Sequence, residues 1–333
     1  MNAGRCHACW VCTVVVSLAP GERVPLRLLG IRDELTNRPW RPPAPHWPGS
    51  HLIGGIDEQA GGTWLAVHPD IPRVACLLNG RGQAADPARR RSRGDLSLRA
   101  AAEGPGFLDR LADDPDALAA YDPFHLICAT LDSVSALTWQ GANPSGDTVS
   151  SVDTVPSADT VPSVGTVPSV DTVSSVDTEG PDGPDFFEYR AAPAVRPLVR
   201  DLAAGTHLFT NAGHAYPVEP GDPAAEPKAA HFADKFAAAR PSADPALPIA
   251  QAWGDWLTLA SGDGLDPADP AAIIVRRDLP DGRVYGTTSV TLVALANLAG
   301  RPAGTVLGAD ASVRYDFQPH PGSSEGWYSV SVG

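Results

Sequence analysis

Lysine is nearly absent from this chain of 333 residues, and methionine and long apolar runs are equally scarce. Lys228 and Lys235 are the only lysines, and no run approaches the roughly 18 to 20 apolar residues that a membrane-spanning helix needs. The formal net charge is −14 and the pI about 4.9, so the surface should repel phosphate backbones and anionic headgroups. We therefore expect no nucleic-acid partner and no transmembrane segment.

The familiar cofactor and catalytic motifs are missing too. The sequence has no G-x-G-x-x-G, no P-loop, no H-E-x-x-H and no G-x-S-x-G. Cys6 and Cys9 have C-x-x-C spacing, but Cys76 and Cys128 stand alone, so a second ligand pair is lacking. We expect neither a cofactor nor a metal, and five cysteines without a regular framework suit a reducing cytoplasm. A hydrolytic site without metal remains compatible with the sequence.

A low-complexity segment divides the chain. Residues 147–178 repeat a six-residue unit, and Pro156, Pro162 and Pro168 occupy the same place in successive units. Proline at a fixed position removes a ladder hydrogen bond each time, which argues against a stacked β-solenoid. We interpret residues 143–184 as a disordered insertion, and residues 12–142 and 185–333 as the two parts of one domain.

Short apolar runs bounded by turn residues predict strands in both parts. They are Cys12 to Leu18, Val24 to Leu29, Thr63 to Val67, Val74 to Leu78, Phe124 to Leu131, His207 to Thr210, Ala271 to Val275, Ser289 to Leu295, Val313 to Phe317 and Trp327 to Val332. Helical periodicity covers Phe107 to Tyr121, Lys228 to Arg240 and Leu247 to Leu259. Strands in consecutive runs with helices in separate blocks predict an α+β fold of antiparallel sheets covered by helices.

The beginning of the chain raises the question of where translation starts. The composition is typical of a GC-rich bacterial genome, in which a GTG valine codon often serves as the start, and Val11 directly precedes Cys12. We interpret residues 1–11 as a mis-annotated extension, so that the mature chain begins with Cys12. A cysteine in that position combines a thiol with a free α-amine. The alternative is a short signal peptide formed by Arg5 and the apolar run that follows it.

Several segments together resemble one known family, the NRDE family, also called the transport and Golgi organisation protein 2 family. The segments are Cys12 to Val16, Arg32 to Glu34, Gly54 to Asp57, Ala60 to Ala66, Leu77 to Gly80, Ser92 to Leu96, Leu208 to Asn211 and Tyr285 to Ser289. The resemblance covers most of residues 12–332 apart from the repeat. In one departure, Ile31 stands where the family has an Asn before Arg-Asp-Glu.

That family is similar to N-terminal nucleophile hydrolases of the cholylglycine and penicillin V acylase type. The resemblance implies a four-layer αββα sandwich of two antiparallel sheets flanked by helices. It also implies a site made from the N-terminal cysteine, an Arg and Asp about twenty residues on, and later asparagines. Here Arg32 and Asp33 follow Cys12 by 20 and 21 residues, and the asparagines are Asn79 and Asn211.

Each of these side chains suits a role in acyl transfer. The α-amine of Cys12 titrates near neutrality and can take the thiol proton. Arg32 can lower the thiol pKa and orient the substrate, while Asp33 holds the α-ammonium group. Asn79 and Asn211 can donate hydrogen bonds to a tetrahedral oxyanion. Arg240 is a further candidate cation.

Structural alternatives exist for every one of them. Cys12 can be a buried core thiol, Arg32 and Asp33 an ion pair at a turn, Asn79 with Gly80 a plain turn, and Asn211 a strand exit. The order of these residues along the chain favours a catalytic site over the separate alternatives.

The sequence thus predicts a cysteine-dependent hydrolase of linear C–N amide bonds in small acylated molecules. The alternative function is non-catalytic: the family resemblance implies links to haem handling and acyl-lipid homeostasis, with haem as the ligand and His207 or His214 as candidate contacts.

Overall fold

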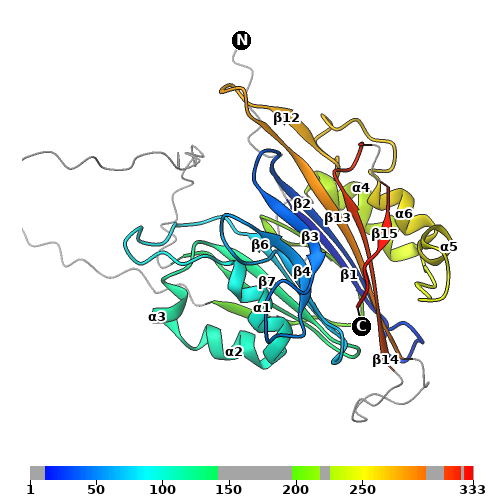
Figure 1. Cartoon of the computed structure of the whole chain (residues 1–333), viewed down its shortest axis with the longest axis horizontal. Helices are drawn as coiled ribbons and strands as arrows, with labels where there is room; N and C mark the ends of the chain where they lie inside the picture. Colours follow the sequence, from blue (N-terminus) through cyan, green and yellow to red (C-terminus); the bar gives the residue numbers. More distant parts are fainter. Residues whose placement is uncertain (1–11, 142–196, 218–225, 298–310, 324–325, 333) are drawn as a thin grey trace, which may run out of the picture.

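The computed structural model describes residues 12–141, 197–217, 226–297, 311–323 and 326–332. These residues form two antiparallel β-sheets that pack face to face, with helices on both outer sides (Figure 1). The predicted extension at 1–11 and the predicted insertion at 143–184 lie outside the described residues. The α+β class expected from the sequence is confirmed.

The first sheet, sheet A, holds the beginning of the described chain. Its strand order is β11-β10-β1-β2-β13-β14-β15, and β12 pairs with β13. The strands are β1 (Thr13–Leu18), β2 (Leu26–Leu35), β10 (Gly205–Thr210), β11 (Gly213–Tyr216), β12 (Arg276–Asp278), β13 (Val284–Asn297), β14 (Ala311–Pro319) and β15 (Tyr328–Ser329). The short strand β1 is therefore central, between β10 and β2, and it is buried along its whole length.

The second sheet, sheet B, is a meander in the order β3-β4-β5-β6-β7-β8-β9. Its strands are β3 (Trp40–Ala44), β4 (Ile53–Asp57), β5 (Leu65–His68), β6 (Arg73–Asn79), β7 (Phe124–Ala129), β8 (Val134–Trp139) and β9 (Leu198–Asp201). Strand β9 comes from the second predicted part of the domain and pairs with β8 from the first. Both parts likewise contribute strands to sheet A, so they share one set of layers.

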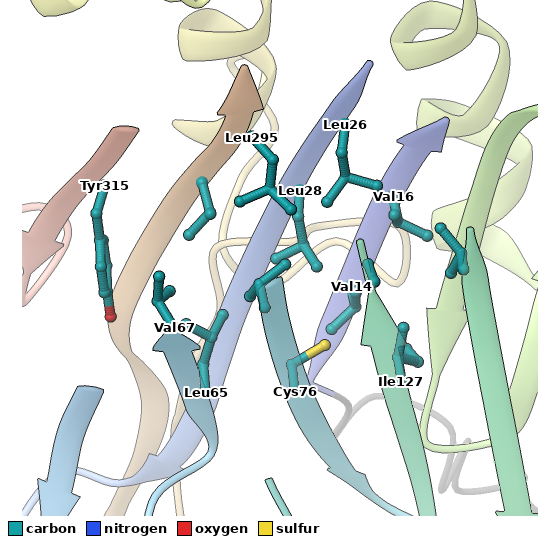
Figure 2. Packing of buried hydrophobic residues seen from close by; sticks show 14 of the residues in the cluster. Val14, Val16, Leu26, Leu28, Leu65, Val67, Cys76, Ile127, Leu295 and Tyr315 are labelled. Atoms are coloured by element: carbon teal, nitrogen blue, oxygen red, sulfur yellow. The ribbon is translucent and has the colours of Figure 1, made fainter. Parts of the chain in front are cut away.

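Three apolar cores correspond to the three contacts between four layers. The central core lies between the sheets, where Val14 and Leu28 of sheet A meet Leu65 and Ile127 of sheet B (Figure 2). A second core joins sheet A to α4 (Pro227–Ala238), α5 (Ile249–Trp253) and α6 (Asp255–Ala260). A third joins sheet B to α1 (Gly94–Glu103), α2 (Gly106–Ala112) and α3 (Pro115–Leu118). This is the four-layer αββα arrangement, helices outside and sheets inside.

Most predicted strands are present, with one clear error. The run Ala271 to Val275 is not a strand but a series of turns and bends, and the adjacent strand β12 starts one residue later. Two predicted helices are each broken in two. Asp114 caps a new helix at Pro115, and Gly254, with φ +48°, separates α5 from α6. Proline and glycine interrupt the helices although the apolar spacing continues across them.

Candidate active site

One end of sheet A brings three of the predicted site residues into a row. The register pairs Thr13 of β1 with Thr210 of β10 on one side and with Ile31 of β2 on the other. Cys12 directly precedes Thr13, Asn211 follows Thr210 and Arg32 follows Ile31, so the three residues lie at the same end of three neighbouring strands. Cys12 packs against the core between the sheets, and the Arg32 guanidinium contacts Asp57 and Trp64 on the sheet B side.

Cys12 is half-buried and its thiol lies against the backbone of the neighbouring strand. Its Sγ atom is 3.4 Å from both the amide nitrogen and the carbonyl oxygen of Asp33. Burial raises the pKa of this thiol to about 12, and the negative charge of the Asp33 carboxylate raises it further. The Asp33 amide and the Arg32 guanidinium lower the thiol pKa but do not outweigh these effects. The thiol is therefore protonated at neutral pH and needs a base before it can attack.

Arg32 is buried and held from three sides. Its Nη1 donates to Thr288 Oγ1 at 2.8 Å, and its Nη2 donates to Asp57 Oδ2 at 3.2 Å. The guanidinium carbon also lies 4.6 Å from the centre of the Trp64 ring, a cation–π contact. Asp57 in turn accepts a 2.6 Å bond from Arg38, and its pKa is lowered by Arg38 and by the Ala60 amide, although burial opposes this.

Asp33 lies on the opposite face of β2, where α4 covers the sheet. Thr287 donates to its Oδ1 at 2.7 Å, and Lys228 Nζ is 3.7 Å from its Oδ2. Burial raises the pKa of Asp33 to about 6, although Lys228, Thr287 and Arg32 all act to lower it. Arg32 and Asp33 are thus not an ion pair at a turn, because neighbours in a strand point to opposite faces and each has its own partner.

Asn211 sits in the turn between β10 and β11, and sheet B supports that turn. The buried ring of His125 in β7 donates from Nε2 to the backbone oxygen of Asn211 at 3.3 Å and bonds Thr138 Oγ1 through Nδ1 at 2.9 Å. Since burial lowers the pKa of His125 to about 4, the ring is neutral and can keep both bonds at neutral pH. The Asn211 Oδ1 atom is itself buried.

Asn79 is placed differently. It ends β6 in sheet B and pairs in register with Phe124. Its neighbour Leu78 points into the core between the sheets, whereas Leu77 packs on the helix side. Strand alternation therefore directs Asn79 toward the helix side, and its side chain is exposed. The structure does not bring Asn79 into the row that holds Cys12.

Sequence reasoning missed several residues that complete this region. Lys228, in the first turn of α4, is one of only two lysines in the chain, which was the signal available. Arg240, which we had considered as a further cation, instead donates to the carbonyl oxygens of Ala237 and Ala239 at the C-terminal end of α4. Asp57, Trp64, Tyr285, Thr287 and Thr288 belong to segments that carry the family resemblance.

Tyr285 brings a hydroxyl close to Cys12. It donates to the backbone oxygen of Asp33 at 3.1 Å. Burial raises its pKa well above the ordinary value, and the nearby charges of Cys12 and Asp33 act in the same direction. A phenol that keeps its proton serves as a hydrogen-bond donor rather than as a base.

The histidines of the alternative function form a pair of their own. His207 Nδ1 is 3.0 Å from His214 Nε2, and His207 Nε2 bonds the backbone oxygen of Ala203 at 2.9 Å. Both ring nitrogens of His207 thus already have partners. Among the residues that the structure describes, no group of three or more His, Cys, Asp or Glu side chains is arranged to hold a metal ion.

Fold and site together define an αββα protein with a cysteine, an arginine and an aspartate gathered at the start of its central strand. The Transport and Golgi organisation 2 family matches residues 11–167, a little under half of the chain. The resemblance stated from the sequence is thereby confirmed for this region, which includes Cys12, Arg32, Asp33 and Asn79. No curated protein matches the sequence.

One solved structure with some likeness is an N-acylethanolamine-hydrolyzing acid amidase (NAAA) ortholog from Caenorhabditis elegans. It is 14% identical, the TM-score is 0.21, and the match covers 38% of this chain and 59% of that chain, less than two thirds of its length. A TM-score this low does not equate the two folds, and the layer order above follows from the strand pairing of this chain.

The helices in the described ranges are all too short or too polar to cross a membrane.

Proposed function

We propose that this protein is a cysteine-dependent hydrolase of the N-terminal nucleophile type, which cleaves amide bonds in small acylated molecules. The observation that carries the proposal is the row formed by Asn211, Cys12 and Arg32 at one end of sheet A, with Asp33 on the next position of β2. A nucleophile, a cation and an amide donor at one end of a sheet are groups that acyl transfer can use.

For Cys12 to act as the nucleophile, the mature chain would have to begin at this residue. With a pKa of about 12, the thiol needs a base within reach. The carboxylate of Asp33 lies on the other face of β2, and Tyr285 holds its own proton. A free α-amine on Cys12 is bonded to the Cα next to the Cβ that carries the thiol, and its ordinary pKa near 8 suits proton transfer at neutral pH.

The reaction then follows in two halves. The α-amine takes the thiol proton, and the thiolate attacks the substrate carbonyl carbon to give a tetrahedral oxyanion. The C–N bond breaks as the α-ammonium returns its proton to the leaving amine, which leaves a thioester on Cys12. Water attacks this thioester, gives a proton to the α-amine, and the carboxylic acid departs as the thiol is restored.

The surrounding residues supply positioning and charge. Arg32 is fixed by Thr288, Asp57 and Trp64, so its guanidinium can orient a carbonyl or carboxylate of the substrate with little loss of freedom. Asn211, held by His125, is the candidate donor to the oxyanion. Removing a donor of this kind typically costs about 3 kcal/mol of transition-state stabilisation.

The direct test treats protein that begins at Cys12 with a thiol-directed acyl probe and follows the intact mass. The proposal predicts addition of one acyl group, followed by its slow release as the thioester hydrolyses. The variant C12A must show neither. A C12A protein labelled to the same extent as the parent would place the reactive thiol elsewhere, and the proposal would be wrong.

The alternative, a carrier of haem or of an acyl lipid, makes a different prediction. Purified protein mixed with haem would then show a shifted Soret band, and H207A or H214A would lose it. The geometry offers little support for His207 as a ligand, because Ala203 and His214 already engage both of its nitrogens. An acyl lipid without haem would instead bind reversibly and protect Cys12 from labelling.

A further inference from the structure

Lys228 is a buried cation that the roles above leave unused. It lies in the first turn of α4, on the helix-covered face of sheet A, and only 2% of it is exposed. Its Nζ atom lies 3.7 Å from Asp33 Oδ2 and 3.4 Å from Thr13 Oγ1. Thr13 directly follows Cys12, so the ammonium group reaches the beginning of β1.

Burying a lysine is expensive unless a partner or a function offsets the cost. Here the partner is Asp33, whose side chain is itself completely buried from solvent. The pair is also connected to β13, because Thr287 donates to the other carboxylate oxygen. Three separate elements, α4, β2 and β13, therefore fix the position of one carboxylate beside the start of β1.

The α-amine of a chain that begins at Cys12 would lie close to this carboxylate. Residues alternate across a strand, and Thr13 already points toward Lys228, while the Cys12 side chain points toward sheet B. Cys12 directly precedes β1, and its thiol contacts the backbone amide and carbonyl of Asp33 in β2, so we expect its backbone nitrogen to lie near Asp33. Asp33 would thus serve two cations, Lys228 and the α-ammonium group.

We infer that Lys228 is a positioning residue for the proposed reaction: it holds the Asp33 carboxylate in place and, as a neighbouring positive charge, favours the unprotonated α-amine that the thiol needs as its base. This inference rests on the proposed function. Without Lys228, the carboxylate would pair with the α-ammonium group alone and stabilise its charged form. With Lys228, repulsion between two cations offsets part of that attraction.

Other charges face this group as well. Arg32 and Glu34 lie on the opposite face of β2, and their charges reach Cys12, while the Tyr285 hydroxyl approaches from β13. These groups are common to the parent protein and to every Lys228 variant. A difference between those proteins therefore reports on Lys228 alone.

The experiment compares chains produced to start at Cys12: the parent, K228M, K228R and the control K235M. Lys235 is the other lysine of the chain, on the same helix but 44% exposed and paired with Asp263. Two rates are followed by intact mass over a pH series. One is acylation by the thiol-directed probe, and the other is condensation of the 1,2-aminothiol with formaldehyde to a thiazolidine, which needs a free amine but no hydrolase activity.

In K228M we expect the midpoint of both pH profiles to rise by about one pH unit. At pH values below the parent's midpoint, both rates should therefore be about tenfold lower than in the parent, and at high pH they should be equal to the parent's. K228R keeps a cation and should stay close to the parent, as should K235M. Circular dichroism confirms that each variant is folded. Should K228M fold too poorly to measure, K228Q provides the same loss of charge with a polar side chain.

The two rates separate the possible failures. If the parent condenses with formaldehyde but is not acylated, the proposed function is wrong. The pH midpoints of condensation in the parent and K228M still test whether Lys228 affects the α-amine. Equal midpoints in folded K228M and the parent, by condensation, would overturn the role of Lys228 and leave the hydrolase proposal standing.

Discussion

The thiol of Cys12 touches the backbone of Asp33 and not its carboxylate. The carboxylate instead lies on the far face of β2, 3.7 Å from Lys228. Strand β2 thus separates the thiol from the Asp33 carboxylate and Lys228. In our proposal, the α-amine of a chain that begins at Cys12 would lie near both.

The first prediction separates Arg32 from a second buried arginine of the same strand. Replacing Arg32 with Met removes bonds to Thr288 and Asp57, and we expect a loss of ~1–3 kcal/mol in the free energy of unfolding, together with at least about tenfold slower acylation. Arg27 bonds Glu22 and Pro241 away from the site. R27M should lose similar stability in urea and keep its acylation rate. Equal acylation of R27M and R32M would remove Arg32 from the mechanism.

The second prediction compares the two asparagines. Asn211 follows Thr210, the partner of Thr13 at the start of β1, whereas Asn79 is exposed at the end of β6 in sheet B. We expect N211A to slow acylation about 100-fold, corresponding to about 3 kcal/mol, and N79A to change it little. Rates at saturating probe, measured by intact mass, decide between them. A larger effect in N79A would mean that the oxyanion is bound from sheet B.

The third prediction concerns pH. His125 has a folded pKa of about 4, below its ordinary 6.5, so the neutral ring stabilises the fold above pH 6.5 and this contribution is lost as the pH falls toward 4. Between about pH 7.5 and about pH 4.5 we expect the parent to lose about 2–3 kcal/mol more stability than H125Q. Urea unfolding at both pH values measures this. The exposed His51 gives a control, H51Q, which should lose as much stability as the parent between the two pH values. An equal loss of stability in H125Q and the parent would contradict the account.

The fourth prediction tests how tightly Trp64 is held over Arg32. A Cβ atom on Gly55 would come within 2.4 Å of the Trp64 ring, so G55A must displace that ring. We expect a loss of ~1–3 kcal/mol in the free energy of unfolding, and slower acylation because Arg32 loses its ring contact. The matched control is G326A, where a Cβ meets nothing within 4 Å. Unchanged stability in G55A would show that Trp64 moves freely.

The sequence predicted the layers better than the site. A continuous apolar run identifies β1, which is buried along its whole length, and the alternation of apolar and polar residues identifies β14. The Gly54–Gly55 pair lies within β4, and Gly61, with φ +72°, lies in the bend that follows this strand. Glycine is needed in that strand because Trp64 packs against it, a tertiary reason that local pattern does not contain.

The family resemblance indicated Cys12, Arg32 and Asp33 together, and the short connection between β1 and β2 brings them close. It could not show that Arg32 and Asp33 face opposite ways with different partners, nor that Lys228 reaches Asp33 from a helix 195 residues later. Such contacts depend on how α4 packs on sheet A. For the same reason Asn79, a good turn signal by itself, was grouped with residues that the fold places elsewhere.

The most direct test of the central claim is the intact mass of native protein before and after treatment with the thiol-directed acyl probe. The account predicts a chain that begins at Cys12 and gains one acyl group, which C12A does not gain. A native chain that retains residues before Cys12, or one that verifiably starts there and stays unmodified by the probe, would contradict it.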